Sequence, residues 1–167
     1  MHPLEGNLLI GIGNDSDSTR TGRFGIEGVK VALFDVADMN NPVQLDSKTF
    51  GHSGSHTQVS YDYHAFSGLQ MDTGYRFTVP MNIYEEQQDS DVKPTIWQYS
   101  GLHLFEVQDR ALVFSGVMKT DERSADQQWP TWETRRGLLQ GDDVYHLRGA
   151  DLFHAPWADP ENMSERF

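Results

Sequence analysis

A Leu-Phe pair recurs three times along this chain of 167 residues, and it is the sequence feature that most constrains the fold. The pair begins the segments Leu33–Val36, Leu104–Val107 and Leu152–Ala155, and in the first two an acidic residue and a valine follow it. The three segments start 71 and 48 residues apart. A four-stranded repeat unit takes roughly 40–50 residues, so the second spacing fits one unit and the first fits one unit with insertions. The recurrence therefore indicates repeated β-structure.

The residues around these pairs have the pattern of short strands rather than of helices. Apolar residues alternate or cluster in short runs that Gly, Asn, Asp and Pro interrupt, as in strands joined by tight turns. A turn and a strand also precede each Leu-Phe strand, with the turns at Gly6-Asn7, Gly74 and Gly141. The expected strands cover residues 8–13, 29–36, 43–50, 57–66, 75–79, 102–107, 111–118, 137–139, 144–147 and 150–153.

These strands divide into groups of three, four and three, which leads to a specific fold prediction. We expect an all-β, β-propeller-like fold with about three four-stranded antiparallel blades, incomplete at both ends. The expected single domain 1–167 contains blade segments at about 1–56, 57–118 and 134–157, with polar loops at 85–95 and 119–133. An all-β sandwich is the alternative, because Leu-Phe pairs also occur there. Open strand edges are an aggregation hazard, so we expect self-association or further blades of a longer propeller to complete the chain.

The composition supports a globular domain and argues against several kinds of partner. Hydrophobic residues make up 37% and charged residues 23% of the chain, which suits a chain with a buried core. The net charge of −12 repels phosphate backbones, and the single Arg135-Arg136 pair is too small to reverse this, so no nucleic-acid partner is expected. The chain has no cysteine, which excludes disulfides and thiolate zinc sites. It also has neither a signal-peptide pattern at its start nor an apolar run of membrane-spanning length.

Four segments carry motifs that occur together, in the same order, in a known family. His2-Pro3 with Asn7–Gly13 is similar to a strand of the pattern HP…N.LIGIG, and Val29–Pro42 to a strand and turn of the pattern K-aliphatic-x-L-F-D-V-S-D-x-x-N-P. Tyr61–Phe66 resembles a Y-D-H-K-A-F element, and Thr134–Asp142 an R-S-L-Y-I-G-D strand. The chain thus resembles bacterial and archaeal proteins with a C-terminal β-propeller distantly related to WD40 repeats. The resemblance implies a propeller and an exported parent protein, extracellular or periplasmic, and it brings no catalytic residue set.

One loop has the residue types of a calcium site. Asp15, Asp17 and Thr19 alternate along Gly13–Thr19, and calcium needs several oxygen ligands that converge on one point. The glycine and the bidentate glutamate of the usual calcium loop are out of register here. A solvated turn is the alternative interpretation, because Asp and Ser also favour turns.

Three histidines form a candidate zinc site. His52 and His56 are four residues apart with Gly54 between them, and His64 follows nearby. On a strand the first two would lie about 13 Å apart at 3.3 Å per residue, so only a tight turn at Gly54 could direct both onto one metal ion. Histidines that make hydrogen bonds in a loop are the alternative. Asp62 with His64 is also expected to form a structural polar network of the kind that ties blades together.

Trp129 and Trp132 lie in the second polar loop, where they could stack on a sugar or a peptide or anchor the loop to the blade surface. Taken together, these features lead us to expect a non-enzymatic binding or scaffold module that presents propeller loops to a protein or carbohydrate ligand. One alternative is a metal-dependent hydrolase or lyase that uses His52, His56 and His64 with Asp62. Another is a calcium-dependent carbohydrate-binding propeller. The chain has no G-x-S-x-G, H-E-x-x-H, P-loop or dinucleotide motif.

Overall fold

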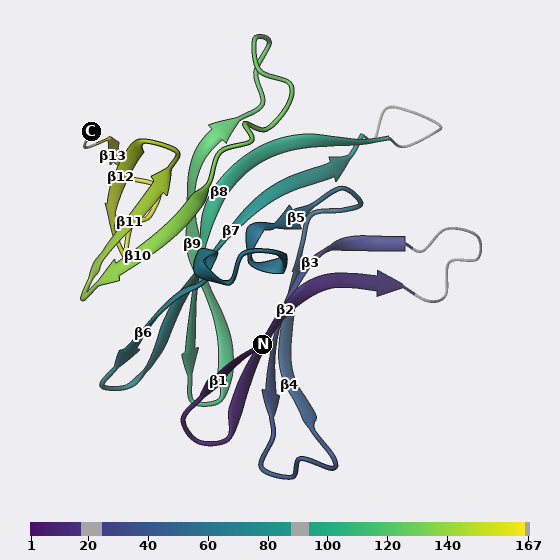
Figure 1. Ribbon diagram of the computed structural model, residues 1–167, viewed down its shortest axis with the longest axis vertical. Helices are drawn as coiled ribbons and strands as arrows, with labels where there is room; N and C mark the ends of the chain where they lie inside the picture. The colour runs from purple at the N-terminus through teal and green to yellow at the C-terminus, as the bar shows by residue number, and fades with distance from the viewer. Residues whose placement is uncertain (18–24, 88–93, 166–167) are drawn as a thin grey trace.

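The protein is described by a computed structural model that covers residues 1–17, 25–87 and 94–165. Within these residues the chain forms three antiparallel sheets that follow one another in chain order (Figure 1). The first sheet has the strand order β1-β2-β3-β4, the middle sheet β5-β7-β8-β9 with β6 paired to β7, and the third sheet β10-β11-β12-β13. The sheets of the described residues do not close into a ring. This confirms the predicted all-β, propeller-like fold.

Each sheet has one very short strand of two or three residues at one edge. The first sheet consists of β1 (His2–Leu4), β2 (Leu8–Asp17), β3 (Gly25–Asp35) and β4 (Val43–Phe50). The middle sheet consists of β5 (His56–Thr57), β6 (Ser67–Met71), β7 (Gly74–Glu86), β8 (Thr95–Gln108) and β9 (Ala111–Glu122). The third sheet consists of β10 (Arg135–Gln140), β11 (Asp143–Arg148), β12 (Asp151–Pro156) and β13 (Ser164–Glu165). The sequence pattern does not predict β1 or β13, because strands of three and two residues are too short to show alternation.

The expected strand over 57–66 is wrong, because this segment forms two 3-10 turns, η1 (Gln58–Ser60) and η2 (Tyr63–Ala65). The Thr57 hydroxyl accepts a hydrogen bond from the backbone N–H of Val59, and the Asp62 carboxylate accepts one from the backbone N–H of His64. Such local bonds compete with strand pairing. No helix in the described part of the chain is long and apolar enough to cross a membrane.

The two polar loops are shorter than the sequence pattern suggests. β7 extends to Glu86 and β8 begins at Thr95, and residues 88–93 of the first loop lie outside the described ranges. β9 extends to Glu122, four residues into the expected loop 119–133. Continued pairing with β8 accounts for this extension, because Asp121 and Glu122 lie opposite Ser100 and Tyr99. The loop that remains covers residues 123–134, and we call it the tryptophan loop.

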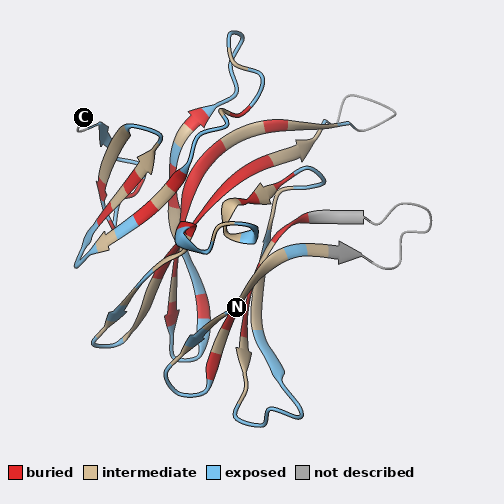
Figure 2. Cartoon of the chain, in the orientation of Figure 1, coloured by how far each residue is buried: buried red, intermediate tan, exposed pale blue. Residues whose placement is uncertain are grey.

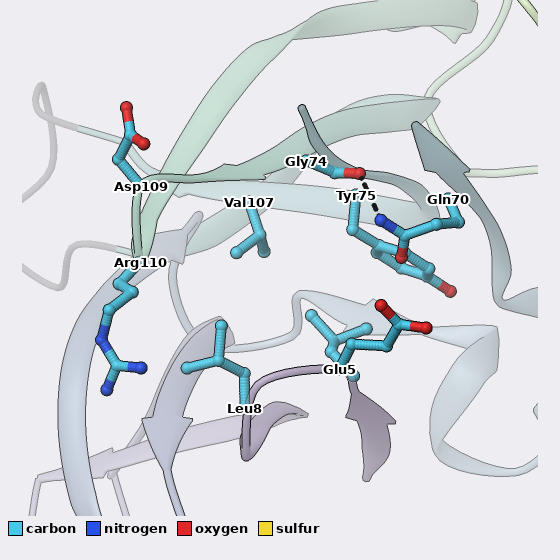
Figure 3. Close-up of a pocket in the computed structure, with 9 residues that line it drawn as sticks. Glu5, Leu8, Gln70, Gly74, Tyr75, Val107, Asp109 and Arg110 are labelled. Atoms are coloured by element: carbon cyan, nitrogen blue, oxygen red, sulfur yellow. Dashed lines mark hydrogen bonds between the residues drawn. The ribbon is translucent and has the colours of Figure 1, made fainter. Parts of the chain in front are cut away.

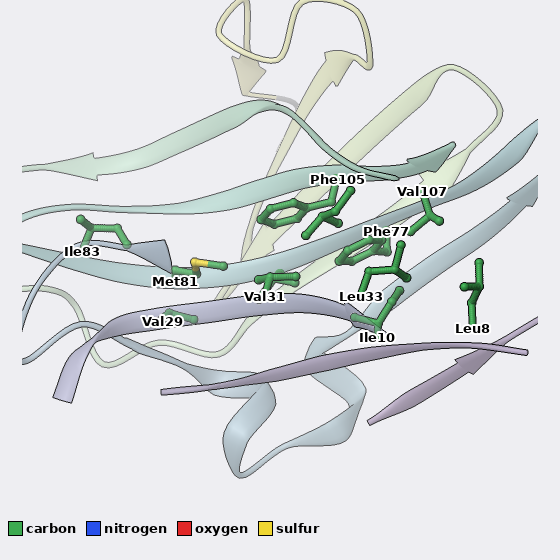
Figure 4. Close-up of a cluster of buried hydrophobic side chains, with 12 residues drawn as sticks. Leu8, Ile10, Val29, Val31, Leu33, Phe77, Met81, Ile83, Phe105 and Val107 are labelled. Atoms are coloured by element: carbon green, nitrogen blue, oxygen red, sulfur yellow. The ribbon is translucent and has the colours of Figure 1, made fainter. Parts of the chain in front are cut away.

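The middle sheet packs one of its faces against the first sheet. Alternate side chains of β7 point to this side, from Phe77 to Ile83, and β8 adds Phe105 and Val107. They meet Ile10 of β2 and Leu33 of β3, both fully buried, in the apolar cluster shown in Figure 4. The full cluster consists of Leu8, Ile10, Val29, Val31, Leu33, Phe77, Val79, Met81, Ile83, Phe105, Val107 and Leu112.

The opposite face of the middle sheet packs against the third sheet. Leu102 and Leu104 of β8, one position out of phase with Phe105 and Val107, point to this side, as strand alternation requires. With Met118 of β9 they form a second apolar cluster against Val144, Ala155 and Trp157 of the third sheet. The middle sheet is therefore buried on both faces, and the buried residues are concentrated along its long strands in Figure 2.

Gly137 of β10 allows the third sheet to approach the middle sheet closely. A Cβ atom at this position would lie 2.0 Å from the Thr78 hydroxyl oxygen and 3.1 Å from a methyl group of Leu102. A distance of 2.0 Å is far inside van der Waals contact, so a larger residue at 137 would force the two sheets apart.

A buried ion pair joins the end of the middle sheet to the start of the third sheet. Arg135 of β10 is 1% exposed and donates a hydrogen bond to Oδ2 of Asp121 in β9. Arg148 of β11 donates to Oδ1 of the same carboxylate at 2.7 Å, and to the carbonyl oxygen of Thr120 at 2.9 Å. Arg135 also donates to the Thr131 hydroxyl at 2.9 Å. One carboxylate thus holds two strands of the third sheet and the tryptophan loop.

Replacing Asp121 with alanine should lower the free energy of unfolding by about 3–5 kcal/mol, because the buried guanidinium of Arg135 loses its counter-charge. Urea unfolding followed by tryptophan fluorescence measures this. Glu122→Ala is the matched control, since among the described residues the carboxylate of Glu122 makes an exposed pair with Lys119 at 3.1 Å, which contributes less than about 1 kcal/mol. Equal losses in the two variants would contradict the assigned role of Asp121.

Candidate functional site

The three candidate zinc ligands do not share a site, because each histidine contacts a different partner. His52 Nε2 lies 3.2 Å from Oε2 of Glu85. His64 Nδ1 lies 3.1 Å from Oδ1 of Asp62. Among the described residues, which include all three histidines, no group of three or more His, Cys, Asp or Glu side chains is placed to hold a metal ion.

His56 belongs to a hydrogen-bond chain that leads from the surface into the middle sheet. Its Nδ1 donates to the carbonyl oxygen of Gly54 at 3.0 Å, so Nε2 is left to accept from the Asn82 amide at 2.8 Å. Asn82 Oδ1 accepts from the Ser100 hydroxyl, whose oxygen accepts from Nε1 of the buried Trp97 at 3.2 Å. Both ring nitrogens of His56 are therefore used within the protein, which leaves neither available to a metal ion.

The candidate calcium loop is only partly within the described residues. Thr19 and the side chain of Asp17 lie outside them. Asp15 accepts a hydrogen bond from the Thr49 hydroxyl at 3.0 Å and lies 3.5 Å from the ammonium group of Lys30. A lysine beside the carboxylate offsets part of the negative charge that would attract a cation. Calcium binding at Asp15, Asp17 and Thr19 stays a prediction.

Asp62 connects the middle sheet to the third sheet. Its Oδ1 accepts from the backbone N–H and from the ring of His64, and its Oδ2 accepts from Arg136 of β10 at 3.3 Å. The backbone N–H of His64 is the main cause that lowers the pKa of Asp62, and the His64 ring and Arg136 lower it further. Asp62 thus contacts both His64 and Arg136, and a role of Asp62 and His64 in tying blades together stays a prediction.

Trp129 and Trp132 are the most solvent-exposed tryptophans of the described chain. Trp129 is 72% exposed and Trp132 is 89% exposed. The Trp132 ring lies nearly parallel to the His56 ring, with centroids 6.4 Å apart and an interplanar angle of 21°. With so much of both indoles in contact with solvent, the tryptophans do little to anchor their own loop.

Other residues anchor the tryptophan loop at both ends. At its start, the backbone N–H of Arg123 donates to the carbonyl oxygen of Gln98 at 2.7 Å. At its end, the Gln58 side chain bridges two backbone groups: its amide donates to the carbonyl oxygen of Glu133 at 2.8 Å, and its oxygen accepts from the N–H of Arg135 at 2.8 Å. The arrangement holds two exposed aromatic rings on a fixed backbone, which suits recognition of a ligand.

The sequence pattern does not reveal Gln58, Asp121 or Arg135 as residues that support this surface. The contacts of Gln58 with residues 133 and 135, and that of Asp121 with Arg135, span 14 to 77 positions along the chain. No local spacing connects them, because the contacts arise only where the middle and third sheets meet.

A shallow cavity lies between the hairpin turns of the first and middle sheets (Figure 3). Glu5 and Leu8 line it from the first sheet, and Gln70, Tyr75 and Arg110 line it from the middle sheet. Its volume of about 260 Å³ is below the roughly 300–1,000 Å³ of typical small-molecule pockets. Arg110 also pairs with Asp35, so the cavity has the features of a junction between sheets rather than of a ligand pocket.

Two histidines are buried inside the fold, away from the exposed loops. His103 is fully buried in β8 and its Nε2 lies 3.1 Å from the Tyr99 hydroxyl. His146 is fully buried in β11, and neither of its ring nitrogens has a hydrogen-bond partner among the described residues. Burial lowers the pKa of each to about 3, and for His146 the charges of Arg135 and Arg148 add to the effect. Both imidazoles are therefore neutral in the folded protein at neutral pH.

Comparison with known proteins identifies the family to which these three stacked antiparallel sheets belong. The model of the β-propeller domain family matches residues 1–157. The chain belongs to this β-propeller family. Each of its sheets is accordingly a blade, and the tryptophan loop connects the second blade to the third.

A curated relative gives no further indication of the activity of this propeller chain. It is an uncharacterized protein of Methanocaldococcus jannaschii, 36% identical over 66 residues, which make up 40% of this chain and 9% of the relative. The matched region is thus a small part of a much longer protein. No solved structure matches the propeller chain.

Replacing His146 with leucine should reduce the loss of stability of the propeller in mild acid. Because the folded pKa of about 3 is below the ordinary 6.5, only the unfolded state takes up the proton as the pH falls below 6.5. A buried neutral histidine of this kind lowers the free energy of unfolding by up to about 1.4 kcal/mol for each unit by which the pH falls. Thermal unfolding of both proteins from pH 7.5 to pH 5 should show a smaller decrease in Tm for the variant. An equal decrease in Tm with falling pH in the two proteins would contradict the assignment of a buried neutral His146.

Proposed function

We propose that this propeller chain is a non-enzymatic binding module whose contact surface is the tryptophan loop. The observation that carries the proposal is the exposure of Trp129 and Trp132, at 72% and 89%, on a loop whose ends are fixed by hydrogen bonds. Tryptophan is among the residues that contribute most to protein–protein binding energy. Large exposed indole rings lower the solubility of a folded chain. Their presence on the surface therefore argues that they contact a partner.

The anchoring of the loop supports binding rather than simple exposure. The Thr131 carbonyl and hydroxyl oxygens both accept hydrogen bonds from the buried Arg135 guanidinium, at 3.3 Å and 2.9 Å. Thr131 lies between the two tryptophans along the chain. A backbone fixed at this point loses less conformational entropy when a ligand binds, so the exposed rings can contribute more of their contact energy to affinity.

The charge around the loop favours a protein ligand with a basic or neutral contact segment. The loop itself contains Asp126 and Glu133 against one cation, Arg123, and the chain carries a net charge of −12. Such a field attracts cations and repels acidic partners. A cationic side chain of the ligand could also stack on the exposed indole faces.

Parallel screens of a phage-displayed peptide library and a glycan array test this proposal. We expect enriched basic or aromatic peptides whose Kd rises at least tenfold in the Trp129→Ala/Trp132→Ala variant, in line with a loss of at least about 1.4 kcal/mol at a central contact. The matched control is Tyr61→Ala/Tyr63→Ala, because these rings are similarly exposed, at 71% and 74%, on a different segment.

Three results of these screens would overturn the protein-binding proposal. Peptides that bind both variants equally would place the contact elsewhere on the propeller. Tryptophan-dependent binding of glycans alone would favour the carbohydrate-binding alternative. No binder in either screen would remove the support for a binding surface here. An extracellular or periplasmic location stays a prediction, which fractionation of cells that express the parent protein tests.

A further inference from the structure

The ring of His56 in β5 lies close to two other aromatic rings, one of them on the tryptophan loop. Its centroid lies 6.4 Å from that of Trp132 on the loop and 6.4 Å from that of Tyr84 in β7. The interplanar angle is 21° between His56 and Trp132 and 38° between His56 and Tyr84. Three elements far apart in the sequence thus bring three flat rings together, and we call Tyr84, His56 and Trp132 the aromatic platform.

A hydrogen-bond chain of fixed direction holds the His56 ring. It begins at the buried Trp97, whose indole N–H can only donate and does so to the Ser100 hydroxyl oxygen at 3.2 Å. Ser100 donates its own hydrogen to Oδ1 of Asn82. The Asn82 amide donates to His56 Nε2 at 2.8 Å, and His56 Nδ1 donates to the carbonyl oxygen of Gly54 at 3.0 Å. Because the chain has a donor at one end and an acceptor at the other, its hydrogens have one arrangement, in which His56 is neutral.

The turn before His56 is bonded to the backbone of Tyr84. The Ser55 hydroxyl accepts from the Tyr84 N–H at 2.9 Å and donates to the Tyr84 carbonyl oxygen at 3.3 Å. The backbone N–H of His52 donates to the same carbonyl oxygen at 2.7 Å. Gly54, with a φ of 100°, packs against the Tyr84 ring so closely that a Cβ atom would lie 3.3 Å from it. Together with the anchored tryptophan loop, these contacts fix the backbone of the platform before a ligand binds, which lowers the entropic cost of binding.

The aromatic platform presents ring faces with carboxylates next to them. Both nitrogens of His56 are bonded within the protein, so the ring face is what it can offer to a ligand. The faces of aromatic rings attract cations, and a neutral imidazole does not repel them. Glu133 follows Trp132 in the chain and Glu85 follows Tyr84, and the two carboxylates are 45% and 44% exposed. These features favour a cationic group as the ligand of the platform.

We propose that the aromatic platform binds an arginine side chain of a protein partner, an inference that rests on the proposed binding function of the tryptophan loop. The guanidinium group of arginine is flat and stacks on aromatic faces, whereas the ammonium group of lysine is a compact, strongly hydrated point charge. The guanidinium also carries several N–H donors in a fixed plane, which suit carboxylates such as those of Glu85 and Glu133. The nearly parallel rings of His56 and Trp132 therefore favour arginine over lysine.

The cations of the neighbouring third blade do not oppose an arginine ligand, because carboxylates neutralise them. Arg135 is buried against Asp121. Arg148 lies beside Asp121, Asp151 and Glu133. These two guanidinium groups are thus matched with three carboxylates. The chain as a whole carries a net charge of −12, which attracts a cationic ligand at long range.

Titration of the unmodified chain with two peptides of equal charge, hexaarginine and hexalysine, tests the proposal. Both peptides experience the general attraction of the negative chain, and they differ in the flat guanidinium groups. We expect the Kd of hexaarginine to be at least about tenfold lower than that of hexalysine. Isothermal titration calorimetry at physiological ionic strength measures both values.

The outcomes distinguish failure of the arginine inference from failure of the proposed function. Equal Kd values for the two peptides would overturn the arginine inference. So would a lack of hexaarginine binding when the library screen yields tryptophan-dependent peptides, and in that case the proposed binding function survives. If neither the titration nor the screen detects binding, both are wrong.

Two tryptophan variants test where the preference for arginine arises. Trp132→Ala should bring the Kd of hexaarginine to that of hexalysine, because the platform loses its most exposed ring. Trp129→Ala is the matched control: Trp129 is exposed on the same loop, but among the described residues the ring of His56 pairs with Trp132 and Tyr84 instead. Circular dichroism confirms that both variants fold. A preference for arginine that survives Trp132→Ala, or that both variants lose equally, would contradict the assigned site.

Nitrogen-15 NMR of the histidine rings tests the fixed state of His56 in the unmodified chain. We expect a protonated Nδ1 and an unprotonated Nε2 at neutral pH, because the hydrogen-bond chain from Trp97 allows this tautomer alone. The variant His56→Phe, which keeps a flat ring without nitrogens, identifies the His56 signals by their absence. A His56 ring protonated at Nε2, or at both nitrogens, would overturn the fixed neutral ring to which the inference assigns part of the arginine site.

Discussion

Burial of both faces of the middle blade is the constraint on which the rest of the structure depends. β8 points apolar side chains to both sides, β7 points its apolar side chains toward the first blade, and most of these side chains are fully buried. A strand that is apolar on both faces is stable only when both are covered. The first and third blades supply the two covers, and they meet the middle blade through separate apolar clusters. The order of the blades in space therefore follows from the side-chain pattern of these two strands.

The Asp121–Arg135 pair connects this core to the surface where binding is proposed. Arg135 begins the third blade, and it also fixes Thr131 between the exposed tryptophans. A buried guanidinium must keep its counter-charge and its acceptors, so the position of the loop is tied to the packing of the second and third blades. The fold thus determines how the indoles of Trp129 and Trp132 are presented, although neither ring is part of the core.

Much of the fold could be predicted from the sequence, because alternation and repeat spacing are local properties. The pairs at Leu33, Leu104 and Leu152 correctly predict three units, and each pair lies in the third strand of a four-stranded path through its sheet. The 3-10 turns between Thr57 and Phe66 could not be predicted from alternation, because capping side chains, rather than apolar periodicity, decide the backbone there.

The candidate site was less predictable, because its residues come together only through contacts between blades. His52, His56 and His64 are close in sequence, but the turns between them direct each to a different partner. Gln58 and Arg135 are far apart in sequence and yet hold the same loop. Proximity along the chain suggested a metal site, whereas the packing of the blades gives an anchored aromatic surface.

Hydrogen exchange under native conditions, measured by mass spectrometry, tests the central role of the middle blade most directly. The account predicts that peptides covering residues 77–83 and 102–107 exchange most slowly of all, and at one common rate set by global unfolding. Peptides from β2, β3, β11 and β12 should exchange faster, through opening of the outer blades. Slower exchange in either outer blade than in β7 and β8 would contradict the claim that the doubly covered middle blade holds the structure together.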